Sequence, residues 1–161
     1  IVFGDFLSID KKDCILDYHH AFNFSLNQFK YEGFHLNAQS MFWRNIVHKN
    51  FSGFVTNLKN TMDYQMILEF GINEGETSFI RIPKVLGAFR RYTGQKTGGN
   101  PSRVHQEHMA IAKQYKYTDK YSIVGKLKYF LFRFRRAWWY FKRGGLSNLI
   151  YRLKIAYDNR F

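Results

Sequence analysis

The 161-residue sequence contains very little cysteine and proline. Cys14 is the only cysteine, so an intramolecular disulfide is impossible and a cysteine-rich zinc site cannot be built. This cysteine usage is typical of a reducing compartment. Two prolines and 45% hydrophobic residues argue against wholesale disorder, and the length is sufficient for one ordinary domain core.

Long apolar runs are also missing. The sequence has no stretch of about 18 uncharged apolar residues that could span a bilayer, and it has no signal-peptide pattern at its start. We therefore expect a soluble or peripheral protein, in the cytoplasm and at the inner face of the membrane. Because the first residues, IVFGD, have the pattern of a buried strand and no initial Met, we also expect a fragment that begins inside a domain.

Acidic residues are scarce in only one part of the chain. The formal net charge is +13, and residues 120–161 hold 11 of the 25 Lys and Arg but one of the 12 Asp and Glu. The basic character therefore belongs to a C-terminal segment, which we expect to meet any polyanionic partner. Residues 1–119 carry a nearly balanced charge.

The sequence pattern predicts an α/β fold. The expected strands cover residues 1–9, 78–83 and 85–92, with Pro83 separating the last two. Residues 38–50 predict a short strand that passes into a helix, with Ser40 as a possible N-cap. Further helices are expected over 60–71, ending at Gly71, and over 103–115, capped by Ser102. Residues 14–36 lack periodicity and predict an irregular substrate-side loop, and the glycine-rich residues 93–102 predict a flexible loop.

The basic C-terminal segment predicts an amphipathic helix over 121–143, broken at Gly144 and Gly145, and a second amphipathic stretch from Leu146 to Leu153. Its apolar stripe consists of Ile123, Leu127, Phe130, Leu131, Phe134, Trp138 and Phe141. Cations interleaved with aromatic residues are typical of helices in a membrane interface, so we expect residues 121–157 to contact an anionic membrane surface. If this stripe packs on the domain instead, Tyr129, Phe132, Trp139 and Tyr140 remain exposed.

Two other interpretations of this segment stay open. The helix could cover a core or the interface of a homodimer. A segment of charge +10 with aromatic side chains could also bind nucleic acid, but no RNP, KH, zinc-finger or helix-turn-helix motif accompanies it, so we expect no nucleic-acid partner.

Asp63 raises a separate question within the predicted helix over 60–71. The i, i+4, i+7 spacing places its carboxylate on the same face as Ile67 and Phe70, where an apolar residue is expected. One interpretation is helix-start chemistry, with Asn60 or Thr61 as N-cap and an acid in the first turn favoured by the helix dipole. The other interpretation is a catalytic base.

Four motifs occur in a fixed order: VFGD, AQSMFWR, MDY at a helix start, and IPKVLGAFRRYTGQKT. Together they resemble the second half of a family 2 glycosyltransferase with the GT-A fold, over roughly residues 1–115. The resemblance implies a partial GT-A (Rossmann-like) domain over residues 1–118, followed by the helical tail 119–161. It also implies a preceding nucleotide-binding half with a DxD metal motif, and no DxD occurs in this sequence.

The resemblance implies an inverting, hexosyltransferase-type enzyme with Asp63 as the general base. Such an enzyme moves a sugar from a nucleotide diphosphate sugar to a glycan or lipid-linked acceptor in polysaccharide, lipopolysaccharide or glycolipid assembly. A divalent metal, Mg or Mn, is expected for the complete enzyme, with its DxD ligands outside this chain, and the chain alone is expected to be inactive. The alternative is a non-catalytic domain that uses the basic aromatic tail to bind a membrane surface or nucleic acid.

Further candidate residues follow from the same motifs. The resemblance implies substrate contacts by Asp5, Gln39, Trp43, Arg44, Arg90, Gln95, Lys96 and Thr97. Of the neighbouring rings Phe42 and Trp43, we expect one in the core and Trp43 at the substrate. Asp5 has a second interpretation, as a turn-forming residue. Tyr92 stands where the family often has His, which puts a metal contact from this chain in doubt. We expect His19, His20, His105 and His108 to be surface or core residues rather than metal ligands.

Overall fold

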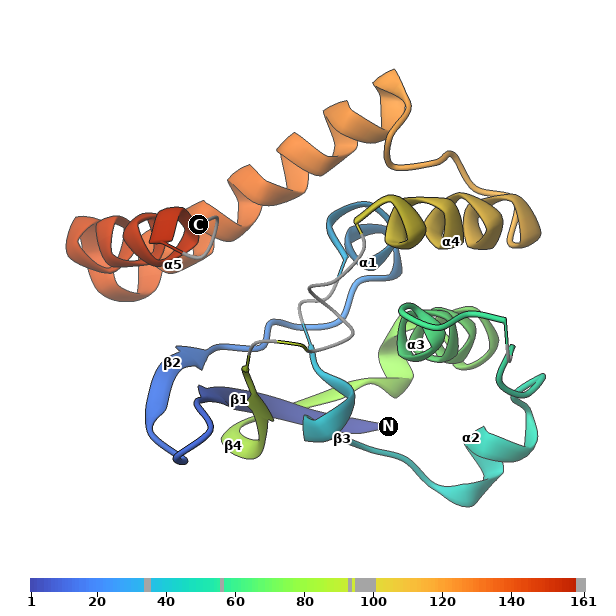
Figure 1. The fold of residues 1–161 in the computed structure, drawn as a ribbon, viewed down its shortest axis with the longest axis horizontal. Helices are drawn as coiled ribbons and strands as arrows, with labels where there is room; N and C mark the ends of the chain where they lie inside the picture. The colour runs from blue at the N-terminus through green and yellow to red at the C-terminus, as the bar shows by residue number, and fades with distance from the viewer. Residues whose placement is uncertain (34–35, 56, 93, 95–100, 159–161) are drawn as a thin grey trace.

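The computed structural model describes residues 1–33, 36–55, 57–92, 94 and 101–158. Its strands are β1 (Val2–Ile9), β2 (Ile15–His19), β3 (Met41–Phe42) and β4 (Ile80–Arg90). Its helices are α1 (Leu26–Glu32), α2 (Asn45–Lys49), α3 (Met62–Glu74), α4 (Pro101–Gln114) and α5 (Ile123–Asp158), and two short 3-10 helices, η1 (Ala38–Ser40) and η2 (Glu76–Ser78), precede β3 and β4. The α/β prediction is therefore confirmed (Figure 1).

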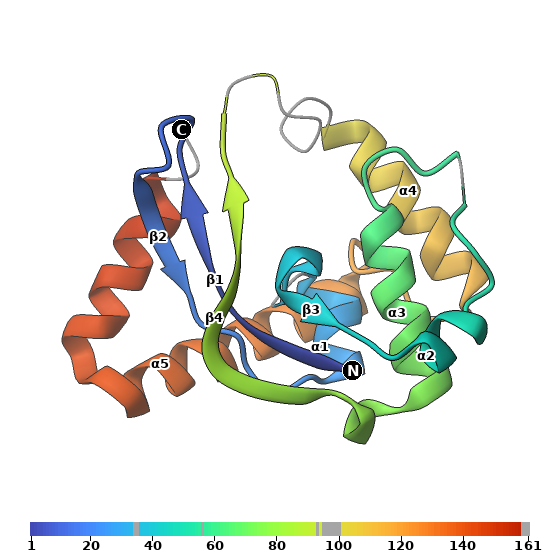
Figure 2. The same cartoon turned by 90° about the horizontal axis from the view of Figure 1, so that it is seen from below.

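The four strands form one mixed sheet with β1 at its centre (Figure 2). Strand β2 pairs with the second half of β1 and β3 pairs with its first two residues, both antiparallel. Strand β4 runs parallel to β1 along its whole length. Two motifs that are far apart in the sequence, VFGD and IPKVLGAFR, therefore lie side by side in the sheet.

The core lies between the sheet and the helices α1, α3 and α4. It is rich in aromatic residues: the fully buried rings of Phe29 from α1 and Tyr64 from α3 stack at 4.7 Å, and Phe3 of β1 and Ile111 of α4 are also buried. Each large apolar side chain removed from water contributes about 1.5–3 kcal/mol. This shared core fixes the position of α3 relative to the sheet.

The prediction of an irregular loop over residues 14–36 is wrong, because the segment contains β2 and α1. Strand β2 is held by its partner β1, with the rings of His19 and Phe6 stacked at 4.5 Å. Helix α1 starts at the N-cap Ser25, and the carboxylate of Glu76 accepts the N–H of Leu26 at 2.7 Å. These partners lie elsewhere in the chain, so local periodicity does not reveal them.

The short strand that passes into a helix within residues 38–50 is confirmed as β3 followed by α2, but Ser40 is not the N-cap of the helix. Helix α2 starts at Asn45, with Arg44 in extended conformation at the N-cap position. The Ser40 hydroxyl instead donates to the carbonyl of Gly4 at 3.1 Å, which ties η1 to β1.

Gly71 does not end the helix that contains Asp63. Helix α3 continues to Glu74, and Gly71 is buried inside it. A Cβ atom on Gly71 would lie 2.8 Å from the ring of Phe24, so the glycine allows that ring to pack closely against the helix. The glycine serves helix packing rather than helix termination.

Pro83 does not separate two strands either. Strand β4 is continuous, and its register against β1 shifts so that Gly4 faces Ile82 whereas Asp5 faces Val85. Pro83 lies in this bulge, a place where a residue without an N–H is tolerated in a sheet.

The sequence also predicted where α4 starts and where the C-terminal helix breaks. Helix α4 starts at Pro101, so Ser102 lies inside its first turn rather than at the N-cap. The predicted break in the tail is confirmed, because α5 is kinked at Gly145, where φ is 65° and ψ is −162°.

Helix α5 packs on α1 with the side of the helix opposite to its apolar stripe. Phe132 is buried, Lys128 donates to the hydroxyl of Tyr31 at 3.0 Å, and Arg136 forms an ion pair with Glu32 of α1. The domain therefore contacts rings that lie outside the stripe, and the stripe itself is exposed. The described residues contain no helix that is long and apolar enough to cross a membrane.

Candidate functional site

Asp63 lies in the first turn of α3. Ile67 and Phe70 on the same helix face are buried, whereas Asp63 itself is exposed. The carboxylate therefore stands where the apolar face of the helix reaches solvent. Among the described residues no side chain donates a hydrogen bond to it, so it is accessible to an external hydroxyl.

The start of α3 is held by Glu107 of α4. The buried Glu107 carboxylate accepts the N–H groups of Lys59 and Asn60 at 3.1 and 3.0 Å, and the Thr61 hydroxyl at 2.9 Å. Burial alone would raise the pKa of Glu107, but these hydrogen bonds outweigh burial and lower the pKa. Thr61 occupies the N-cap position without capping through its side chain, because its hydroxyl is used by Glu107. An anchored helix start gives Asp63 a fixed position.

The pKa of Asp63 is raised above the usual aspartate value. Removal of part of its hydration by the surrounding protein is the main cause, and the backbone N–H of Tyr64, 2.9 Å from the carboxylate, and that of Asp63 itself lower it by less. A carboxylate with a raised pKa is a stronger base, and this one is also accessible. Both properties favour proton abstraction.

Trp43 and Arg44 line a groove of about 590 Å³ together with Phe42 and Glu74. The ring of Trp43 packs edge-on against Phe70 at 5.3 Å and is half-buried, whereas Phe42 is 58% exposed. Trp43 is thus the ring closer to the core, in contrast to the expectation. Gln39 is exposed in η1 and does not line this groove.

Asp5 lies inside β1, so the interpretation as a turn-forming residue is wrong. Its carboxylate is 3% exposed and accepts hydrogen bonds from the Tyr18 hydroxyl at 2.7 Å, the Ala21 N–H at 2.9 Å and Arg81 at 3.2 Å. His20 Nδ1 lies 3.3 Å away. Burial raises the pKa of Asp5, but the hydrogen bonds together outweigh burial and lower it. A substrate would have to displace these partners before it could contact Asp5.

The candidates near residue 95 are only partly described. Arg90 at the end of β4 donates to the carbonyl of Asp10 at 2.8 Å and pairs with Asp13, so it holds the turn between β1 and β2. Gln95, Lys96 and Thr97 lie outside the described residues. Tyr92 is exposed, with the Lys11 ammonium 6.0 Å from its ring.

The histidines occupy ordinary structural positions. His108 is buried against the edge of the Tyr64 ring, and burial lowers its pKa to about 3. His19 shares a 2.8 Å hydrogen bond with Ser8, and His105 stacks on Tyr121 at 3.7 Å. In the part of the chain that the structure describes, no three His, Cys, Asp or Glu side chains converge on a possible metal position.

Sequence reasoning missed Glu107 and Arg81. Glu107 lies 46 residues from its partner Thr61, and its neighbours in the sequence drew attention only to the histidines. The sequence pattern places Arg81 in a strand, but it does not reveal its partner Asp5, which is 76 residues away. The pairing of Asp5 with Arg81 is predictable only from the parallel register of β1 and β4.

No family model matches the chain, and no curated protein or solved structure matches it at a significant level. The resemblance to family 2 glycosyltransferases therefore rests on the four sequence motifs.

Proposed function

We propose that the chain is the acceptor-side half of an inverting GT-A glycosyltransferase of family 2, with Asp63 as the general base. The main support is that Asp63 is accessible, carries a raised pKa and stands on an anchored helix start. The arrangement of the motifs adds to this support. VFGD and IPKVLGAFR pair in one sheet, and AQSMFWR contains β3, which pairs with the same central strand.

The proposed reaction is a single displacement at the anomeric carbon of the donor sugar. Asp63 accepts the proton of the acceptor hydroxyl while the acceptor oxygen forms the new glycosidic bond. The bond from the anomeric carbon to the diphosphate breaks at the same time, and its electron pair leaves with the nucleoside diphosphate. A divalent metal bound outside the described residues would neutralise the charge on that leaving group.

The acceptor is proposed to lie along the groove beside Trp43. Phe70, which contacts Trp43, is seven residues from Asp63, about 10 Å along the helix at 1.5 Å per residue. An acceptor glycan of more than one sugar could thus place a hydroxyl at Asp63 and stack a further ring on an aromatic side chain.

A donor screen tests the proposed activity. The full-length protein should release a nucleoside diphosphate from one of the UDP-, GDP- or dTDP-sugars, and only when an acceptor is present. Release is measured by a coupled nucleotide assay, with the donor incubated without acceptor as control. Failure of every donor with glycan and lipid-linked acceptors would favour the non-catalytic interpretation.

We also propose that α5 attaches the protein to an anionic membrane surface. All seven residues of the apolar stripe are exposed, with Ile123 at 80%, Phe130 at 67% and Phe134 at 69%. An exposed apolar stripe on a basic helix matches the charge and polarity of an anionic lipid interface. This attachment would bring the transferase to a lipid-linked acceptor.

Vesicle binding tests this attachment. The double substitution Phe130→Ser and Phe134→Ser should weaken binding to vesicles of phosphatidylcholine and phosphatidylglycerol by about tenfold or more, because each buried phenylalanine contributes at least about 1.5 kcal/mol. Binding is measured by co-sedimentation at low and high salt.

The matched control is Phe42→Ser with Phe54→Ser, two exposed phenylalanines outside α5. This control should leave vesicle binding unchanged. Binding of the unaltered protein to oligonucleotides in preference to vesicles would contradict the membrane proposal. Dimers that dissociate on substitution of the stripe would instead assign the stripe to a protein interface.

A further inference from the structure

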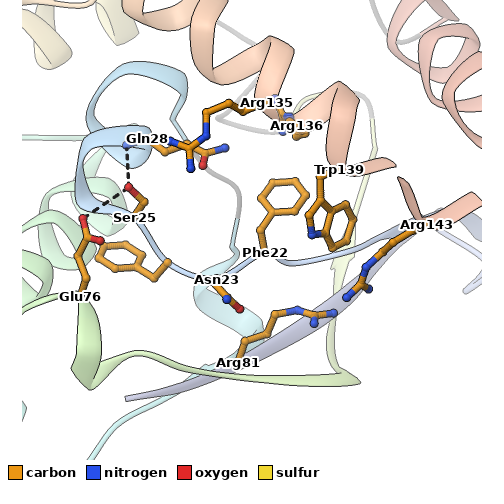
Figure 3. Close-up of a pocket in the computed structure, with 11 residues that line it drawn as sticks. Phe22, Asn23, Ser25, Gln28, Glu76, Arg81, Arg135, Arg136, Trp139 and Arg143 are labelled. Carbon is orange, nitrogen blue, oxygen red and sulfur yellow. Dashed lines mark hydrogen bonds between the residues drawn. The ribbon is translucent and has the colours of Figure 1, made fainter. Parts of the chain in front are cut away.

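A pocket of about 440 Å³ lies between α5, β4 and the segment that leads into α1 (Figure 3). Four arginines line it: Arg81 from β4, and Arg135, Arg136 and Arg143 from α5. Asp63 does not line this pocket, and neither do Trp43 and Arg44. It is therefore separate from the candidate transfer site.

The charge of the pocket is only partly neutralised within the protein. Arg81 pairs with Asp5, and Arg136 pairs with Glu32. Among the described residues, no carboxylate lies within ion-pair distance of Arg135 or Arg143. The one carboxylate that lines the pocket, Glu76, accepts hydrogen bonds from the Leu26 N–H and the Ser25 hydroxyl at the start of α1.

Contacts within the protein hold the guanidinium groups of Arg81 and Arg143 in place. Asp5 accepts a hydrogen bond from Nη2 of Arg81. The buried Nε of Arg81 has no hydrogen-bond partner in the described part of the chain. Arg143 lies over the ring of Trp139, 4.2 Å from the ring centroid. Figure 3 shows Arg81 and Arg143 pointing toward the same part of the pocket. Like charges that converge in this way repel each other unless an anion lies between them.

We propose that this pocket binds a phosphate or diphosphate group. Arginine is well suited to this ligand because its planar guanidinium donates two parallel hydrogen bonds to phosphate oxygens. The T-shaped pair of Phe22 and Trp139, with ring centroids 4.9 Å apart, provides an apolar wall for a sugar or other group attached to the phosphate. The ligand class is a phosphorylated glycan or a diphosphate.

The position of the pocket on α5 restricts the source of the phosphate. At 100° per residue, Arg136 and Arg143 project from the side of the helix opposite to the apolar stripe. A helix with its side chains is about 10–12 Å wide, so a lipid head group directly beneath the stripe lies too far away. A phosphate on an extended head group or on a free molecule can reach the pocket.

Calorimetric titration of the full-length protein with pyrophosphate tests the site. The titration is done at low salt and without divalent metal, so that metal-dependent donor binding does not contribute. We expect saturable binding that becomes about tenfold weaker or more in the variant Arg135→Gln with Arg143→Gln, because the variant loses two cations and their charge-assisted hydrogen bonds to the anion.

The matched control is Lys126→Gln with Lys154→Gln, which removes the same charge from exposed positions of α5 outside the pocket. It should leave the affinity for pyrophosphate within about twofold of the original value, since distant surface charges are screened. Equal weakening in both variants would show that only the net charge of the protein affects binding, and this would overturn the site. Absence of saturable binding in the unaltered protein would overturn it as well.

Competition with vesicles assigns the source of the phosphate. If saturating pyrophosphate releases the protein from vesicles that contain a phosphatidylinositol phosphate, whose phosphate stands on an extended head group, the site takes a lipid head group. If vesicle binding is unchanged, it takes a phosphate outside the bilayer. Either outcome supports the site once the dependence on Arg135 and Arg143 is established. The inference does not rest on the proposed transferase activity, since its readout is binding.

Discussion

Replacing Asp63 by asparagine should reduce sugar transfer by the full-length protein about 10²–10⁴-fold, the usual contribution of a general base. Asparagine keeps the size of the side chain and an oxygen that can accept the Tyr64 N–H, but it cannot take up a proton. The loss should be in kcat, with donor affinity unchanged. Steady-state kinetics and donor binding by calorimetry measure the two separately.

The pH dependence distinguishes a base from a merely structural acid. Because the pKa of Asp63 is raised, kcat/KM should increase with pH up to a pKa above the normal aspartate value of about 3.9. The residual activity of Asp63→Asn should lack this acidic limb. An unchanged pH profile in the variant, or near-normal turnover, would remove Asp63 from the mechanism.

The matched control for this variant is Asp119→Asn. Asp119 precedes α5, and its carboxylate accepts the N–H of Tyr121 at 3.3 Å, a contact that the asparagine oxygen can keep. The control should be fully active. Asp63→Asn should also unfold at nearly the same temperature as the original protein, because its raised pKa means that folding does not favour the charged form of Asp63.

Local patterns predicted those elements whose cause is local. The kink in α5 follows from the Gly144–Gly145 pair, because Gly145 adopts a positive φ that favours glycine. The position of Asp63 at a helix start also follows from its neighbours. The seven residues of the apolar stripe lie on one side of α5, as predicted. They are exposed because the opposite side of the helix packs on α1.

The remaining errors concern features set by distant residues. Gly71 resembles a helix stop until the ring of Phe24 is placed against it, and Pro83 resembles a strand end until the register shift of β4 is known. Asp5 has the sequence context of a turn or a substrate ligand. Its role as the centre of a buried network depends on Arg81, which β4 brings alongside β1.

Replacing Asp5 by asparagine should destabilise the protein by about 3–5 kcal/mol, the cost of removing one partner of a buried ion pair. The side chains of Asp5 and Arg81 are 3% and 11% exposed, so the arginine would be left with a buried, uncompensated charge. The Tyr18 hydroxyl and the Ala21 N–H would also lose a charged acceptor. Urea unfolding measures the loss.

The matched control is Asp13→Asn, which breaks the exposed ion pair with Arg90 at the turn between β1 and β2. Because Asp13 is 72% exposed, this change should cost no more than about 1 kcal/mol. A loss of that small size in Asp5→Asn would contradict the structural role of the buried pair.

The contribution of Asp5 should also depend on pH in a defined direction. The pKa of Asp5 is lowered in the folded protein, so its stabilising effect is fully present above the unfolded-state pKa of about 3.9 and is lost as the pH falls through the folded-state pKa. The difference in unfolding free energy between the original protein and Asp5→Asn should therefore shrink below about pH 4. Urea unfolding of both proteins at several pH values measures this difference. A difference that does not change with pH would exclude the Asp5 carboxylate as its source.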